Sequence, residues 1–138
     1  MMKSKIHRAT ITDTNLDYVG SITLDPELMA RADILEFEQV AVLDIDNGSR
    51  FETYAMAGGP GDVIVNGAAA HLVGPGHRVI VITYGSYDEA ELEGFAPKVV
   101  HVDETNREIP EHDAVQRVGS NLVWMQPARA GRRSRPGS

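Results

Sequence analysis

The stretch that decides the fold is QVAVLDIDNGSRFETYAMA, residues 39–57, where apolar and polar residues alternate on both sides of an Asn-Gly pair. Period-2 alternation is typical of half-buried strands. The pattern predicts one strand over residues 39–46 and a second over residues 50–57. Because Asn47-Gly48 is the residue pair favoured in a type I′ turn, we expect the two strands to form a β-hairpin.

The same alternation recurs along the chain, separated by turn signals. A short helix is expected after Asp25-Pro26, since Asp favours the N-cap and Pro the first helical position. Another turn or short helix is expected over residues 88–92, and a third could cover residues 68–72 with Asn66 as its cap. Seven or so short strands with so little helix predict a mainly β fold, a small closed barrel. The further strands are expected over residues 5–12, 18–24, 63–65, 78–84 and 98–102.

Composition narrows the class of protein. The net charge is −7, but residues 126–138 contain four Arg and no acid, so the other 125 residues, with nine Lys or Arg and all 20 acidic residues, have a net charge of −11. An acidic body argues against nucleic-acid binding. There is no Cys and no apolar run that approaches the roughly 18 residues of a membrane span. We therefore expect a cytoplasmic protein without a membrane partner, with a single β-barrel domain over residues 1–125 and a disordered basic tail over residues 126–138.

One dipeptide could undergo a reaction with its own backbone. Gly20-Ser21 lies inside the strand expected over residues 18–24 rather than in a turn. Gly within a strand usually marks a bulge or a close backbone approach. A Ser hydroxyl placed against the preceding carbonyl can also attack its own backbone, so the pair is a candidate self-cleavage site. The residues alone leave both interpretations open.

Three further segments accompany Tyr18-Val-Gly-Ser21: Lys5-Ile-His-Arg8, residues 47–55, and Val65-Asn-Gly-Ala-Ala-Ala-His71. In order and spacing, from about residue 3 to about residue 103, they resemble the aspartate 1-decarboxylase family, pyruvoyl-dependent enzymes that make β-alanine for pantothenate synthesis. The resemblance implies a double-psi β-barrel and a homotetramer with active sites between subunits. Some family members need an accessory maturation factor and others mature unaided.

The resemblance also implies autocatalytic cleavage between Gly20 and Ser21, giving a β chain of residues 1–20 and an α chain of residues 21–125 plus the tail. Attack of the Ser21 hydroxyl on the Gly20 carbonyl creates an oxyanion, for which the family implies Thr53 as donor. Elimination then releases the first chain and leaves a pyruvoyl group, formed from Ser21, as a covalent cofactor. Such a group is an electron sink for the decarboxylation of L-aspartate to β-alanine and CO2.

Site residues follow from the same resemblance. Ser21 and Tyr54 are the expected catalytic residues, and a phenol with a pKa of about 10 stays protonated at neutral pH and can act as an acid. Arg50 offers a planar fork that suits a carboxylate, and Lys5 would add a second positive charge. The other expected substrate-binding residues are Thr53, Asn66, Gly67, Ala68 and Ala69, with His7 and Tyr18 as possible supporting residues.

Two other functions remain open at this point. An unprocessed, non-catalytic barrel could bind a small acidic ligand, because cleavage depends on backbone strain at Gly20 that a sequence does not display. A metal site would need at least three converging ligands, and no His-x-His or His-Glu-x-x-His spacing is present. No metal is expected. The histidines that such a site could draw on are His7, His71, His77, His101 and His112.

Overall fold

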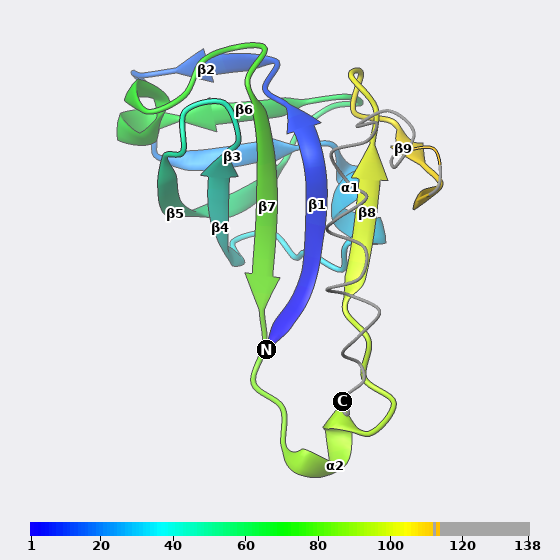
Figure 1. The fold of residues 1–138 in the computed structure, drawn as a ribbon. Coiled ribbons are helices and arrows are strands. Elements are labelled where there is room, and N and C mark those ends of the chain that lie inside the picture. The colour runs from blue at the N-terminus through cyan, green and yellow to red at the C-terminus, as the bar shows by residue number, and fades with distance from the viewer. Residues whose placement is uncertain (112, 114–138) are drawn as a thin grey trace. The chain divides into compact units, whose positions relative to one another are not determined.

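The computed structural model describes residues 1–111 and 113, of which Met1–Glu108 form one compact unit (Figure 1). Within the described residues, no helix is long and apolar enough to cross a membrane. The expected basic tail, residues 126–138, lies outside the described residues, as does His112. The elements are β1 (Met2–Thr10), β2 (Asp13–Asn15), β3 (Ser21–Leu24), α1 (Pro26–Arg31), β4 (Gln39–Asp44), β5 (Arg50–Ala57), β6 (Val63–Asn66), the 3-10 helix η1 (Gly67–His71), β7 (Arg78–Tyr84), α2 (Glu89–Leu92), β8 (Lys98–Val102) and β9 (Glu108–Ile109).

The described strands form one sheet in the order β2-β6-β3-β5-β4-β7-β1-β8-β9. Most neighbours are antiparallel, but β1 pairs parallel with β8, β2 with β6, and β3 with β5. Figure 1 shows β2, β6 and β3 running across the direction of β7 and β1. β5 joins the two directions, since Tyr54 is its last residue paired with β4 and Ala55 its first paired with β3. The expected mainly β fold is confirmed.

Closure of the barrel differs from the expectation. Among the described residues, no ladder joins β2 to β9, the two ends of the strand order, so the sheet is not closed by strand pairing. These end strands have three and two residues, which leaves little backbone for a ladder. A buried side chain, Asn106, instead links the end of β1 to a neighbouring loop. Its amide accepts from the Thr10 N–H at 2.7 Å and donates to the carbonyls of Thr10 and Gly61 at 2.9 and 3.0 Å.

The core comes from the inward residues of the alternating strands. Ile6 of β1, Ile22 of β3, Val42 of β4, Val63 of β6 and Val81 of β7 are all fully buried in one cluster. Burying a Val, Leu or Ile side chain contributes about 1.5–3 kcal/mol. Residues at alternate positions must then face outward, which leaves one face of the sheet for polar and catalytic groups.

Helix α1 begins as its sequence predicts. The Asp25 side chain accepts from the Glu27 N–H at 2.8 Å, and Pro26 occupies the first helical position. Leu28 and Met29 are buried in the core, and the helix contacts β8 (Figure 1). The second Asp25 oxygen accepts from the Gly61 N–H at 2.8 Å, so one carboxylate ties the helix to the loop before β6.

Strand boundaries were predicted with mixed success. Strands over residues 50–57, 78–84 and 98–102 are confirmed in full. The strand expected over residues 18–24 is wrong at its start, because the chain bends at Tyr18 and Gly20 and β3 begins at Ser21. The bend is supported by the Asn15 side chain, which accepts from the Asp17 N–H at 3.2 Å.

The type I′ turn predicted at Asn47-Gly48 is also wrong. Such a turn needs positive φ at both central residues; Gly48 has φ 78°, but Asn47 is not among the non-glycine residues with positive φ. Leu43 pairs with Arg50, and the Asp44 N–H donates to the Ser49 carbonyl. The connection is therefore a longer loop. Asp44 stabilises it by accepting from the backbone N–H groups of residues 46 and 47.

Candidate functional site

Ser21 lies at the junction between a bend and a strand. It is 2% exposed, and its Oγ accepts a hydrogen bond from Nδ2 of Asn66 at 3.0 Å. The same hydroxyl lies 3.5 Å from the Val19 carbonyl oxygen. The preceding residues are open to solvent, with Tyr18 60% and Val19 71% exposed. The Gly20-Ser21 peptide thus joins an exposed loop to a buried hydroxyl.

Asn66 holds that hydroxyl in place. It is the last residue of β6, is 3% exposed and pairs directly with Ser21 in the β3–β6 register. Its Nδ2 also donates to Thr23 Oγ1 at 3.1 Å. The short helix expected over residues 68–72 forms as η1, but Asn66 makes no side-chain capping bond to it. Instead of capping η1, the amide donates through Nδ2 to two hydroxyls across the sheet.

Gly67 brings two backbone segments into contact. Its φ is 76°, and a Cβ built there would lie 2.6 Å from Gly20 Cα and 2.8 Å from Gly20 N. Real side chains do not tolerate such distances, so the close approach to Gly20 requires glycine. Ala68, the next residue, is exposed, and Ala69 is half-buried against the core.

Thr53 and Tyr54 lie on opposite faces of β5. Ile22 of β3 pairs with Ala55 of β5, and both are fully buried. Alternation then places Tyr54 and Ser21 together on the outer face, in neighbouring positions of adjacent strands. Thr53 shares the inner side with Ala55, and among the described residues it makes no hydrogen bond to Gly20 or Ser21. Tyr54 is therefore placed beside Ser21, whereas Thr53 is not shown as an oxyanion donor.

The two expected cations lie elsewhere in the sheet. Arg50 is exposed at the start of β5, four residues before Tyr54 on the same face, and its Nη2 donates to the Tyr84 hydroxyl at 3.3 Å. Lys5 lies on the outer face of β1, and β5, β4 and β7 separate β1 from β3 in the strand order. With neighbouring strands about 4.8 Å apart, Lys5 is distant from Ser21 along the sheet. Lys5 and Ser21 therefore do not lie on neighbouring strands of the sheet.

His7 lies two residues after Lys5 on the same strand. Its ring meets that of His101 on β8 edge to face, with centroids 5.5 Å apart. Burial, together with nearby positive charges of which Lys5 contributes most, lowers the pKa of His7 to about 4. His7 is consequently a neutral imidazole at neutral pH. It belongs to the surroundings of Lys5 and not to those of Ser21.

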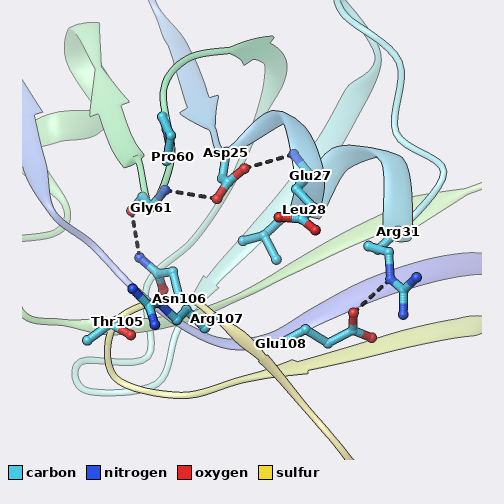
Figure 2. Close-up of a pocket in the computed structure, with 10 residues that line it drawn as sticks. All are labelled: Asp25, Glu27, Leu28, Arg31, Pro60, Gly61, Thr105, Asn106, Arg107 and Glu108. Atoms are coloured by element: carbon cyan, nitrogen blue, oxygen red, sulfur yellow. Dashed lines mark hydrogen bonds and ion pairs between the residues drawn. The ribbon is translucent and has the colours of Figure 1, made fainter.

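A cavity of about 680 Å³ beside α1 contains none of the expected residues. Figure 2 shows its polar groups paired with one another: Asp25 with the N–H groups of Glu27 and Gly61, and Arg31 with Glu108 at 2.7 Å. These contacts connect α1 to the loops around it. The cavity is a structural feature away from Ser21.

Among the described residues, His7, His71, His77 and His101 are not gathered into one group of possible metal ligands. In the part of the chain that the structure describes, the group of three possible ligands is Asp44, Asp46 and His77. Their atoms already have partners, since His77 Nδ1 lies 2.6 Å from Asp44 Oδ2 and Asp46 accepts from the Arg78 N–H. The cluster therefore acts as a link between the β4–β5 loop and β7.

Comparison with known proteins shows which family the chain belongs to. The family model described as Aspartate decarboxylase matches residues 1–109. The chain belongs to the aspartate decarboxylase family. An aspartate 1-decarboxylase of Acetivibrio thermocellus is 59% identical over 109 residues, covering 78% of this chain and 86% of the relative. The aspartate decarboxylase fold is a double-psi β-barrel, in keeping with a sheet whose strands run in two directions.

Three residues near the site were not predicted from sequence: Thr23, Tyr84 and Phe37. Thr23 could have been found, because it lies two residues after Ser21 and so shares its face. Tyr84 contacts Arg50 through a strand order that a sequence pattern does not reveal. Phe37 has a positive φ of 71°, a conformation that no residue pattern predicts for an aromatic side chain.

Proposed function

We propose that this chain matures by cleavage between Gly20 and Ser21 and decarboxylates L-aspartate to β-alanine and CO2 for pantothenate synthesis. The observation that carries the proposal is the buried Ser21 hydroxyl, hydrogen-bonded to Asn66, in a member of the aspartate decarboxylase family. The same peptide is packed against Gly67. A hydroxyl held at a fixed place beside its own backbone suits an intramolecular attack.

The residues around position 21 fit a pyruvoyl group. Asn66 Nδ2 offers a donor to an oxygen at this position, and the missing Cβ of Gly67 lets the Gly20 backbone pack closely beside it. Such a group supplies an electron sink for the loss of CO2. The chain's own contribution is to bury it, to orient it through Asn66 and to exclude bulk water.

Tyr54 is the proposed proton donor to the former α-carbon. It shares the outer face with Ser21 and occupies the adjacent strand, which is the placement that proton delivery requires. Arg50, on the same face of β5, would bind a substrate carboxylate through its planar guanidinium. Gly67, Ala68 and Ala69 would contact substrate through their backbone. Thr53 remains the proposed oxyanion donor for cleavage, by family resemblance alone.

Lys5 and His7 would reach a site on a second protomer. Their distance from Ser21 along the sheet supports active sites between subunits, as the proposed homotetramer would provide. Tyr18, exposed at 60% in one chain, is the proposed supporting residue on the loop facing that neighbour. We further propose that the enzyme is cytoplasmic and that a maturation factor assists cleavage if the purified chain remains intact.

The test combines mass and activity. The intact mass of purified protein under denaturing conditions should show two species, residues 1–20 and residues 21–138, and the larger should react with borohydride. The matured protein should release β-alanine from L-aspartate. Ser21→Ala should abolish both cleavage and activity. If fully cleaved protein produced no β-alanine, the proposed activity would be wrong. If coexpression with candidate maturation factors never gave cleavage, the chain would be the unprocessed barrel that binds a small acidic ligand.

A further inference from the structure

Phe37 combines two unfavourable features. Its φ is 71°, in the left-handed region, and its side chain is 71% exposed to solvent. A bulky residue with positive φ is a backbone outlier, and such outliers gather at functional sites. Glycine would be the unstrained residue here. The contacts of the Phe37 backbone and ring explain why this strained conformation is kept.

The backbone around Phe37 is fixed by β5. The Phe37 N–H donates to the Ala55 carbonyl at 2.7 Å, and the Ala55 N–H donates to the Glu38 carbonyl at 2.9 Å. Ala55 directly follows Tyr54. Glu38 is held in turn, because its carboxylate accepts from the Leu35 N–H at 2.9 Å and from Lys3 Nζ at 2.7 Å. These bonds maintain the strained conformation and fix where the aromatic ring lies.

The ring lies against Tyr54. The centroids of the Phe37 and Tyr54 rings are 6.5 Å apart and the rings are inclined at 32°, within the range in which aromatic pairs attract. Within residues 1–111 and 113, the Tyr54 hydroxyl has no hydrogen-bond partner. Phe37 is thus the aromatic neighbour that limits how the phenol can swing over the outer face.

We propose that Phe37 is a positioning residue that aims the Tyr54 hydroxyl at the reacting carbon. The inference rests on the proposed function, in which Tyr54 delivers a proton. Proton transfer needs heavy atoms within about 3.2 Å, and a misplacement of about 1 Å can cost about a hundredfold in rate. A ring held on one side of the phenol restricts this error. The left-handed strain at Phe37 is the cost of placing the ring there.

The central variant is Phe37→Gly, which removes the ring and relieves the strain together. We expect full cleavage by intact mass, an unchanged or raised melting temperature, and a kcat lowered about tenfold with KM changed less than about twofold. Leu35→Ala is the matched control, since Leu35 is 70% exposed in the same loop and has no aromatic ring to pair with Tyr54. It should leave kcat and KM unchanged.

Two readouts separate positioning from structure. In D2O the native enzyme should place deuterium on one face of the former α-carbon and give one enantiomer of monodeuterated β-alanine. Phe37→Gly should give a mixture of the two enantiomers, because water competes with a misplaced donor. In the cleavage-deficient Ser21→Ala chain, labelled tyrosine spectra should show the Tyr54 resonance moving on Phe37→Gly and not on Leu35→Ala. There are four tyrosines, and Tyr54→Phe assigns the resonance.

The outcomes distinguish the two proposals. If Tyr54→Phe lowers kcat while Phe37→Gly keeps native kcat and stereochemistry, the positioning role is wrong and the proposed donor stands. If Tyr54→Phe retains full decarboxylation, the donor assignment itself fails, and the role of Phe37 fails with it. Support requires that Phe37→Gly reduces kcat in the native background and adds nothing in the Tyr54→Phe background.

Discussion

At the scale of single residues, the close contact between Gly67 and Gly20 requires glycine at position 67. Gly67→Ala would place a methyl group 2.6 Å from Gly20 Cα in a backbone with φ 76°. We expect self-cleavage to stop or slow strongly, because the processing peptide must move to accept the methyl group. Intact mass over a maturation time course measures this directly.

Gly48→Ala is the control for that substitution. Gly48 has nearly the same φ, 78°, but a methyl group at this position would meet no atom within 4 Å. Both variants incur the left-handed strain of about 1–2 kcal/mol, and only Gly67→Ala adds a collision. Denaturant unfolding should therefore rank Gly67→Ala as the less stable of the two. Normal cleavage in Gly67→Ala, with stability equal to that of Gly48→Ala, would contradict the close approach.

Sequence reasoning found the residues of the candidate site better than their arrangement. Asn66 was expected as a helix cap, yet its amide donates to Ser21 and Thr23, because the antiparallel β3–β6 register pairs Asn66 with Ser21 and Thr23 lies two residues further along the same face. Thr53 and Tyr54 are adjacent in sequence and were expected in one site. On a strand, adjacency puts them on opposite faces. Only the strand order shows which of them accompanies Ser21.

At the scale of elements, the hydrophobic period found each described strand of four or more residues, although the bounds of β1 differ from the expected 5–12, and it missed the two shortest strands. β5 and β7 are long enough for alternation to be read, and both have the expected bounds. β2 has three residues and β9 two, too few to establish a period. The helix α1 was predictable because its signal is chemical: an N-cap Asp and a Pro in the first turn.

Asp25 gives an element-scale prediction, because one carboxylate serves both α1 and the loop before β6. Asp25→Ala would remove the cap on Glu27 N–H and leave Gly61 N–H without its partner. Loss of a cap costs about 1 kcal/mol and an unpaired, part-buried N–H about 1–3 kcal/mol. We expect the free energy of unfolding to fall by about 2–3 kcal/mol in urea titrations.

Asp88→Ala is the matched control for Asp25→Ala. Asp88 caps α2, a four-residue helix with no buried residue, through a capping box with Glu91. Its loss should cost less than about 1 kcal/mol. Equal losses in the two variants would mean that the Asp25 bond to Gly61 adds nothing to stability.

At the scale of the whole molecule, the proposed site residues are divided between two parts of the sheet. The inward side chains of β1, β3 and β5 belong to the core, so Ser21, Tyr54 and Lys5 lie on the outer face. Ser21 and Tyr54 are neighbours there, while Lys5 and His7 lie several strands away. In the homotetramer proposed above, a second copy of the chain would supply Lys5 to this site.

The stability of the whole molecule should depend on pH, because folding shifts the pKa values of His7 and His77 in opposite directions. Burial lowers the pKa of His7 from 6.5 to about 4, so between these values the unfolded chain binds more protons at this residue than the folded chain. The free energy of unfolding should therefore fall as the pH drops from about 6.5 to about 4. His7→Gln should flatten this acid limb in denaturant titrations at several pH values.

His77 should affect the pH dependence of the free energy of unfolding in the opposite direction. Its hydrogen bond to Asp44 raises its pKa above 6.5, so its contribution is fully present below pH 6.5 and is lost as the pH rises through the folded-state value. His77→Gln should flatten the limb above pH 6.5 and leave the acid limb that His7 creates. If His7→Gln left the acid limb unchanged, protons taken up elsewhere would govern acid unfolding, and His7 would not be the buried neutral imidazole that its surroundings require.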